Sequence, residues 1–220
     1  MTPCGYTKPV PSIYSVKPAF QRGLRPLVSL LARAGITANE VTVLACVLSA
    51  SVGALTAWRI QSRSLLLLLP VFFFVRMALN AMDGMLAREF SQTSALGACL
   101  NELCDVISDA FLLLPFALLP AFDPVWMGAI IVLAVISEMA GTVAVMIGAS
   151  RRYDGPMGKS DRAFVFGALA LWVGLGWNII TWVSWLFPRL MALLLAVTIV
   201  NRIRNGLADS RASLTTSRSC

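Results

Sequence analysis

The sequence contains no histidine and few charged residues. Of its 220 residues, 13% are Asp, Glu, Lys or Arg, whereas 58% are hydrophobic, and the mean hydropathy is +0.77. The lack of histidine excludes this side chain as a general base, a nucleophile or a metal ligand. A composition this apolar is typical of an integral membrane protein.

Cysteines are also few, and their spacing does not fit a metal site. The sequence predicts neither a disulfide framework nor a zinc centre. Residues 1–12 lack an apolar core, so they do not resemble a cleavable signal. The net charge is +7. We attribute this charge to basic loops on one side of a membrane and expect no nucleic-acid partner. The five cysteines are Cys4, Cys46, Cys99, Cys104 and Cys220.

Long hydrophobic runs predict an all-α bundle of six transmembrane helices. Several runs are uncharged, and the others are interrupted by few charges. The last apolar stretch is too long for one helix, so we expect a break between residues 176 and 181. The predicted spans are 41–58, 64–88, 94–122, 124–150, 163 to about 176, and about 182 to 200.

Basic residues predict the orientation of this bundle. An even number of spans places both termini on one side. That side carries fourteen Lys and Arg residues, whereas the opposite loops hold only Arg59, Arg63 and Arg189. The positive-inside rule therefore predicts cytoplasmic termini. Tryptophans near the opposite ends fit an interfacial aromatic belt, and they are Trp58, Trp126, Trp177, Trp182 and Trp185.

The N-terminal segment is amphipathic. Ile13, Val16, Phe20, Leu24, Leu27 and Leu31 share one helical face, opposite Lys17, Gln21, Arg22 and Arg25. This pattern favours an interfacial helix on anionic headgroups, kinked at Pro26. The alternative is a poorly ordered basic arm. We predict three regions: an arm with this helix (1–38), a transmembrane domain (39–208) and a cytoplasmic tail (209–220).

Ionisable residues cluster within two of the predicted spans. Asp83, Glu102, Asp105 and Asp109 are acidic, and Arg76 is the single deep cation there. Each such carboxylate costs roughly 2.5 to 3.5 kcal/mol at a bilayer centre. A membrane helix retains such groups only if they pair, line a wet cavity or hold an ion.

The spacing of these residues places them on facing helices. Within each of the two spans the polar residues are three or four positions apart, so those of one span lie on one helical face. The polar segment 89–94 is short, so the two helices run antiparallel, and residues equidistant from it lie at equal depth. A cluster of oxygen ligands at that depth suits a hard divalent cation. The expected opposite pairs are Asn80 with Asp105, Asp83 with Asn101, and Arg76 with Asp109.

From Asn80 to Asp105 the chain reads N-x2-DG-x2-AR-x8-G-x3-N-x3-D. This pattern resembles the signature of the CDP-alcohol phosphotransferase family, D-x2-DG-x2-AR-x8-G-x3-D-x3-D. Every spacing agrees, but Asn80 and Asn101 replace the first and third acids. NEVT at 39–42 and DGPMGKSDR at 154–162 add to the resemblance, which is to a bacterial inner-membrane branch of the family.

The resemblance implies a role for each motif residue. Asn80, Asp83, Asn101 and Asp105 would hold Mg²⁺ or Mn²⁺, and Asp105 would also be the general base. With only two acids left, the site balances one divalent ion rather than two. The residues implied in nucleotide binding are Asn39, Thr42, Gly84, Ala87, Arg88 and Gly97. Those implied in binding an acceptor or lipid phosphate are Arg151, Arg152, Lys159 and Arg162.

The resemblance implies an enzyme of phospholipid biosynthesis. It would transfer a substituted phosphate from CDP-diacylglycerol, or another CDP-alcohol, to a small alcohol or a lipid, and release CMP. The missing acids motivate an alternative, a non-catalytic CDP-lipid-binding scaffold. A transporter is a weaker alternative, because the acids lie near one membrane surface. A homodimer is left open.

Several of these residues have purely structural interpretations. Asp83 and Asp105 could pair with Arg88 and Arg76. Asn39 and Thr42 could cap a helix. We interpret Arg76 and Asp109 as a structural ion pair, with a metal or base role for Asp109 as the alternative. Glu138, which has no obvious partner, is interpreted as a satisfied buried acid rather than a proton relay. Glu102 lies beside Asn101 and could replace its lost charge only by reaching around the helix.

Overall fold

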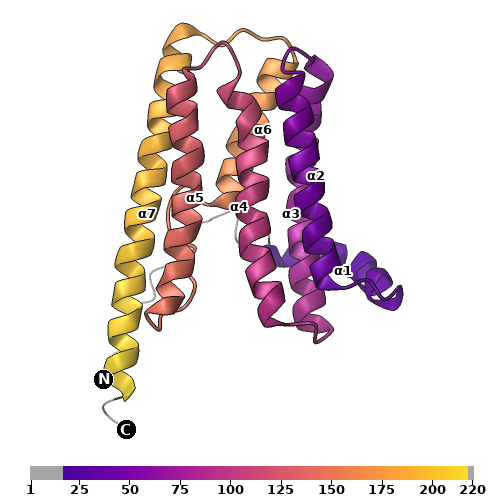
Figure 1. The fold of residues 1–220 in the computed structure, drawn as a ribbon, viewed down its shortest axis with the longest axis vertical. Coiled ribbons are helices and arrows are strands. Elements are labelled where there is room, and N and C mark those ends of the chain that lie inside the picture. The colour runs from indigo at the N-terminus through magenta and orange to yellow at the C-terminus, as the bar shows by residue number, and fades with distance from the viewer. Residues whose placement is uncertain (1–16, 218–220) are drawn as a thin grey trace.

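The computed structural model describes the backbone of residues 17–217 and the side chains of residues 20–212. All regular secondary structure in this part of the chain is helical and it contains no strand, which confirms the all-α class (Figure 1). Its helices are α1 (Lys17–Arg33), α2 (Ala38–Trp58), α3 (Arg63–Glu89), α4 (Ala95–Ala117), α5 (Pro124–Met146), α6 (Lys159–Gly174) and α7 (Thr181–Ser217).

Local sequence signals explain where several helices begin. Thr37 and Glu40 form a reciprocal capping box at the start of α2. The Ser94 hydroxyl accepts a 2.9 Å hydrogen bond from the Gly97 N–H and so caps α4. Asp123 caps α5, whose first residue is Pro124, a position where the absent N–H costs nothing.

Helix α2 is the central packing element of the end that carries the motif. It packs closely against both α3 and α4, whose own backbones make few close approaches to each other. At Gly53 the α2 backbone lies so close to the Phe111 carbonyl of α4 that a Cβ atom would not fit. The bundle continues from α4 to α5 and α7, while α6 packs against α3 and lies behind α4 in the view of Figure 1.

Four helices, α2, α3, α5 and α7, are long and apolar enough to cross a membrane. The chain is therefore an integral membrane protein, as its composition indicated. Two further predicted spans have helical counterparts, but α4 contains three acidic residues and α6 has only 16 residues. The number six remains a prediction. The break expected between residues 176 and 181 is present, because α6 ends at Gly174 and α7 begins at Thr181.

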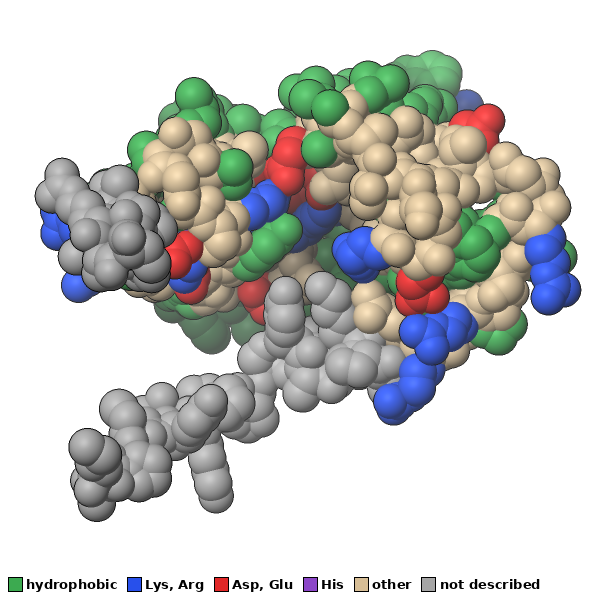
Figure 2. Space-filling view, turned by 90° about the horizontal axis from the view of Figure 1, so that it is seen from below, with side chains coloured by type: hydrophobic (Ala, Val, Ile, Leu, Met, Phe, Trp, Pro, Cys, Tyr) green, Lys and Arg blue, Asp and Glu red, His purple; other side chains and the backbone are tan. Residues whose placement is uncertain are grey.

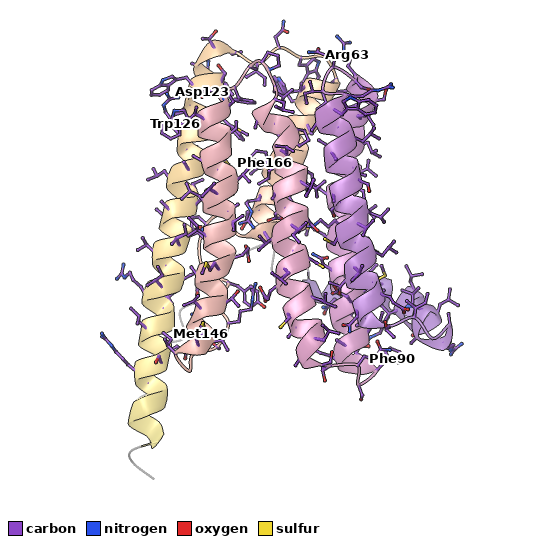
Figure 3. All side chains as sticks on the ribbon, viewed as in Figure 1. Arg63, Phe90, Asp123, Trp126, Met146 and Phe166 are labelled. Atoms are coloured by element: carbon purple, nitrogen blue, oxygen red, sulfur yellow. The ribbon has the colours of Figure 1, made fainter. Side chains whose placement is uncertain are left out.

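Different loops and chain ends lie at the two ends of the bundle. Figure 3 shows Arg63, Asp123 and Trp126 at one end, with Phe90 and Met146 at the other. The connection between α3 and α4 thus lies at the end where α7 terminates (Figure 1). This arrangement agrees with the predicted grouping of loops, whereas the side of the membrane that each end faces remains a prediction.

Helix α1 lies at the motif end and packs against α3. Its Val28 is fully buried in a small cluster with Met82, Met85 and Leu86 of α3. Ile13, Val16 and the Lys17 side chain lie outside the described residues, so the interfacial role of this helix stays a prediction. The three cysteines with described side chains, Cys46, Cys99 and Cys104, are free thiols.

Candidate metal and nucleotide site

Two of the three expected contacts between α3 and α4 are present. The Asn80 Nδ2 donates to Asp105 Oδ1 at 2.9 Å, and Arg76 Nη1 lies 2.5 Å from Asp109 Oδ1. These contacts span the space between two helices whose backbones hardly touch, so side chains make the connection. The first and last positions of the motif therefore meet at one point.

Asp83 lies beside this contact and is held by α2. Its carboxylate is buried and accepts a 2.8 Å hydrogen bond from the Thr42 hydroxyl. Thr42 therefore orients a motif acid and is not a helix cap, because Thr37 fills that role. Among the described residues no ion pair joins Asp83 to Arg88, so the pairing considered from sequence is absent.

Asn39 and the two motif glycines form close contacts near these acids. A Cβ atom on Gly97 would lie 2.7 Å from the Asn39 Oδ1, so the N-terminal turn of α2 packs directly on the start of α4. The Arg88 guanidinium folds over Gly84, with Nη1 3.2 Å from the position of a Cβ there. Larger side chains at either glycine would displace Asn39 or Arg88.

Asp105 is contacted from three sides. Asn80 donates to Oδ1, the Lys159 ammonium contacts Oδ2, and Arg76 Nη2 lies 3.7 Å from Oδ1. Arg76 also donates to the Asp105 main-chain oxygen at 3.0 Å. The pairing of Asp105 with Arg76 that the sequence allowed is thus present as a long contact, and Lys159 is the closer cation.

Asn101 and Glu102 differ in their surroundings although they are neighbours. Asn101 is half-buried one turn before Asp105. Glu102 Oε1 lies 2.5 Å from Arg151 Nε, and its other oxygen accepts a 3.3 Å hydrogen bond from Thr142 of α5. Glu102 is therefore committed to Arg151 and does not replace the charge absent at Asn101.

The basic loop before α6 does not act as one group. Lys159 is the member that reaches the motif acids, while Arg152 pairs with Asp154 at 2.8 Å and with Asp209 at 3.5 Å. Burial alone would lower the pKa of Arg151, but its hydrogen bond to Glu102 raises the pKa, so the guanidinium stays charged.

Arg162 lies in the interior instead of lining an open phosphate site. Its side chain is 2% exposed, with Nη2 2.5 Å from Asp109 and 2.8 Å from Glu138. A phosphate could reach it only by displacing both carboxylates, so the geometry does not support the role that the loop's resemblance implied. Glu138, which had no evident partner in the sequence, contacts Arg162, Arg202 at 3.4 Å and Arg151 at 3.4 Å.

Arg202 of α7 was not identified from the sequence as part of this region. It is 1% exposed, and it donates to the main-chain oxygens of Ser137 and Asp154. In the sequence it follows the apolar part of the last predicted span, where a basic residue indicates only the orientation of the bundle. Its neighbours in the chain do not indicate that it points inward.

The oxygen atoms of the motif side chains fit a hard divalent cation, but few of them carry a negative charge. No group of three or more Cys, Asp, Glu or His side chains that could hold a metal occurs among the described residues. Asp83 and Asp105 provide two carboxylates, and Asn80 and Asn101 provide neutral amide oxygens, all of which are ligand types for Mg²⁺ or Mn²⁺. Two carboxylates balance one divalent ion, and Lys159 would have to leave Asp105 as that ion entered.

The face that carries these residues is polar at its centre. Figure 2 views the bundle from the motif end and shows acidic and basic side chains gathered between the helices, with hydrophobic side chains on the outside. A cavity of about 300 Å³, lined among others by Arg63, Leu66 and Trp177, lies at the opposite end. It contains no motif residue and is not part of the site.

Most of the chain is similar in sequence to known proteins. A sequence profile of CDP-alcohol phosphatidyltransferases matches residues 35–203. The inner membrane protein YnbA of Escherichia coli (strain K12) is 42% identical over 204 residues, which are 90% of this chain and 98% of that protein.

Crystal structures of a phosphatidylinositol phosphate synthase of Mycobacterium tuberculosis have a similar fold. The structure with CDP-DAG bound has a TM-score of 0.68 at 20% identity and covers 82% of this chain and 92% of that chain. The structure in complex with manganese and citrate has a TM-score of 0.67 at 22% identity, covering 83% and 88%.

Proposed function

Because the chain belongs to the CDP-alcohol phosphatidyltransferase family, we propose that it transfers a substituted phosphate from a CDP-linked donor to an alcohol and releases CMP. CDP-diacylglycerol is the proposed donor, since a solved structure of similar fold carries CDP-DAG. The product would then be a phospholipid. The relative described as an inner membrane protein supports the same location here, with residues 39–208 as the transmembrane domain.

The observation that carries this proposal is the meeting of Asn80, Asp83 and Asp105 at one end of the bundle. Asn80 and Asp105 are hydrogen-bonded, and Asp83 is fixed beside them by Thr42. Such oxygen ligands on rigid helices are the arrangement that holds a divalent cation against a diphosphate.

Asp83, Asp105, Asn80 and Asn101 would hold Mg²⁺ or Mn²⁺, which would neutralise charge on the diphosphate as the bond to CMP breaks. Asp105 would accept the proton of the attacking hydroxyl. A carboxylate surrounded by cations is a weak base, so the precise placement of the alcohol must supply much of the rate. Lys159 would move from Asp105 to a donor phosphate oxygen.

The nucleotide would bind along α2 and the connected ends of α3 and α4. Gly84 and Gly97 leave room for the nucleotide near the backbone, and Arg88 lies over Gly84 with its charge available to a phosphate. Asn39 and Thr42 line the α2 side, and Ala87 completes the motif. Binding would require Asn39 to shift from its contact with Gly97.

The test is CMP release by the purified protein in lipid nanodiscs. We expect CMP to form only when CDP-diacylglycerol, Mg²⁺ or Mn²⁺ and an alcohol are all present. EDTA should abolish the reaction, and Mg²⁺ should restore it. Mass spectrometry should identify a phospholipid that contains the added alcohol.

Two observations favour a second candidate, a CDP-lipid-binding scaffold without catalysis. Asp105 is occupied by Lys159, and two of the four acidic motif positions are Asn. Saturable binding of CDP-diacylglycerol, with no CMP release for any alcohol tested, would select the scaffold and reject the transferase.

A further inference from the structure

A buried network of charges extends from the motif into the bundle. Asp109 lies between Arg76 and Arg162, with 2.5 Å contacts to each. Glu138 continues the network from Arg162 to Arg202. The three arginines are 1–2% exposed, so these charges are compensated by protein groups rather than by water.

Acidic and basic side chains in this network are equal in number. Each of the five cations contacts at least one of the carboxylates, and Asp83 interacts electrostatically with Asp105 and Lys159. These ten side chains are therefore neutral as a set. The cations are Arg76, Arg151, Lys159, Arg162 and Arg202, and the acids are Asp83, Glu102, Asp105, Asp109 and Glu138.

The charges in this network balance one another, but some of its hydrogen-bond donors have no acceptor. Among the described side chains, Arg76 Nε and Arg151 Nη1 are buried N–H donors without a hydrogen-bond partner. Arg76 also contacts Asp105, and Arg151 contacts Glu102 next to Asn101, so both donors belong to residues that border the motif. Buried donors of this kind are normally satisfied, and a hydroxyl oxygen can satisfy them without adding charge.

The next step rests on the proposed function. The net charge of the site with donor and metal bound decides whether an uncharged or a phosphorylated alcohol can bind as acceptor. One divalent cation offsets the two negative charges of a diphosphate, so donor and metal together leave the region neutral. A phosphorylated alcohol would add about 1.5 to 2 further negative charges. No arginine of the network remains free to offset them, and the charge of Arg88 is already assigned to a phosphate of the donor. In a poorly hydrated site such an uncompensated charge is strongly disfavoured.

We propose that the acceptor is an uncharged polyhydroxy alcohol, not a phosphorylated one. Asp109, Glu138 and Glu102 determine this specificity because they neutralise the arginines that would otherwise bind an acceptor phosphate. Arg151, whose side chain is 18% exposed, instead donates a hydrogen bond to an acceptor hydroxyl. Within the network Lys159 is the one cation free to move, and the donor diphosphate uses it.

The first experiment compares alcohols that differ only by a phosphate group. CMP release from CDP-diacylglycerol is measured with glycerol against glycerol 3-phosphate, and with inositol against inositol 1-phosphate, at matched ionic strength. We expect kcat/KM to favour the uncharged member of each pair by at least about tenfold. Preference for the phosphorylated members would overturn the acceptor assignment alone. No CMP release with any alcohol would overturn it together with the proposed function.

The second experiment does not depend on turnover. The melting temperature of the wild-type protein in detergent is measured against increasing glycerol 3-phosphate, with sodium chloride of equal ionic strength as the control. We expect no saturable stabilisation by glycerol 3-phosphate above that produced by sodium chloride. A saturable shift that persists when CDP-diacylglycerol fills the donor site would show a separate phosphate site and overturn the proposal.

A pair of variants tests the neutralising acids. Glu102→Gln removes a carboxylate from Arg151, and we expect the preference for uncharged alcohols to fall by about tenfold. Asp209→Asn is the matched control, because it removes a carboxylate from Arg152, which lies outside the network. An unchanged preference in Glu102→Gln, or an equal fall in both variants, would contradict the assigned role of Glu102.

Discussion

Two groups of buried acids in this protein have opposite environments. Asp83 and Asp105 lie at the motif end, held by an amide, a hydroxyl, one movable lysine and a long 3.7 Å contact from Arg76 to Asp105. Asp109 and Glu138 lie farther along the network, each fixed by at least two cations that include the buried Arg162. The carboxylate oxygens of the first pair can therefore still bind a metal cation. Those of the second pair are held in ion pairs that stabilise the bundle.

The difference shows that burial alone does not identify a reactive acid in a membrane protein. All four carboxylates are 5–9% exposed. What separates them is whether their closest partners are exchangeable, as an amide, a hydroxyl and a lysine are, or are buried arginines fixed by several contacts. Substitutions should therefore affect activity in one group and stability in the other.

The largest expected effect is on turnover at Asp105. Asp105→Asn keeps the side-chain volume but removes the base and one ligand charge. We expect CMP release to fall by about 100- to 10,000-fold, as for loss of a general base. Its melting temperature should change little compared with that of Arg162→Met. Turnover equal to wild type would remove Asp105 from the mechanism.

A large effect on stability is expected at Arg162. Arg162→Met leaves Asp109 and Glu138 with one fewer cation each, at a cost of about 3 to 5 kcal/mol for a broken buried pair. The measurement is thermal or denaturant unfolding in detergent. Normal stability with lost activity would instead place Arg162 in the reacting site and erase the contrast between the two groups.

A smaller change is expected from restoring the acids that the motif lacks. Asn80→Asp combined with Asn101→Asp adds two negative charges beside Asp83 and Asp105. We expect the Mg²⁺ or Mn²⁺ concentration for half-maximal activity to fall by about tenfold, because Coulomb attraction increases. Calorimetric titration of the metal gives a check that does not need turnover. An unchanged titration would argue that neither asparagine is a ligand.

The smallest effect is expected outside the bundle core, at Arg25. Arg25 pairs with Glu89 at 3.1 Å, and their side chains are 63% and 37% exposed. Arg25→Ala should change the unfolding free energy by only about 0 to 1 kcal/mol, as for surface ion pairs. A loss as large as that of Arg162→Met would show that α1 is coupled to the network.

The motif contacts were predictable because spacing determines them. Helical steps of four and a short turn place Asn80 opposite Asp105 and Arg76 opposite Asp109, and both contacts are present. Helix limits were less accurate where no strong signal marks an end. The span predicted to reach residue 122 ends at Ala117, and Pro115 lies within its last turn.

The partners of Glu138 were not predictable in this way. Arg162 and Arg202 are far from Glu138 in the sequence and lie on α6 and α7. Periodicity indicates which face of a helix is apolar, but it does not indicate which helix will lie opposite. The same limit applies to Thr42, whose contact with Asp83 depends on α2 packing against α3.

The order of these charges along the chain has a consequence for synthesis and membrane insertion. Arg76 and Asp109 lie on consecutive helices, so they can neutralise each other as soon as α4 has emerged. Glu138 is made before Arg151, Arg162 and Arg202, the partners that surround it in the finished bundle. A ribosome-bound chain that stops at α5 therefore carries an acid whose cationic partners come only with the following loop, α6 and α7, and the charge of Glu138 should be compensated only after these segments have followed.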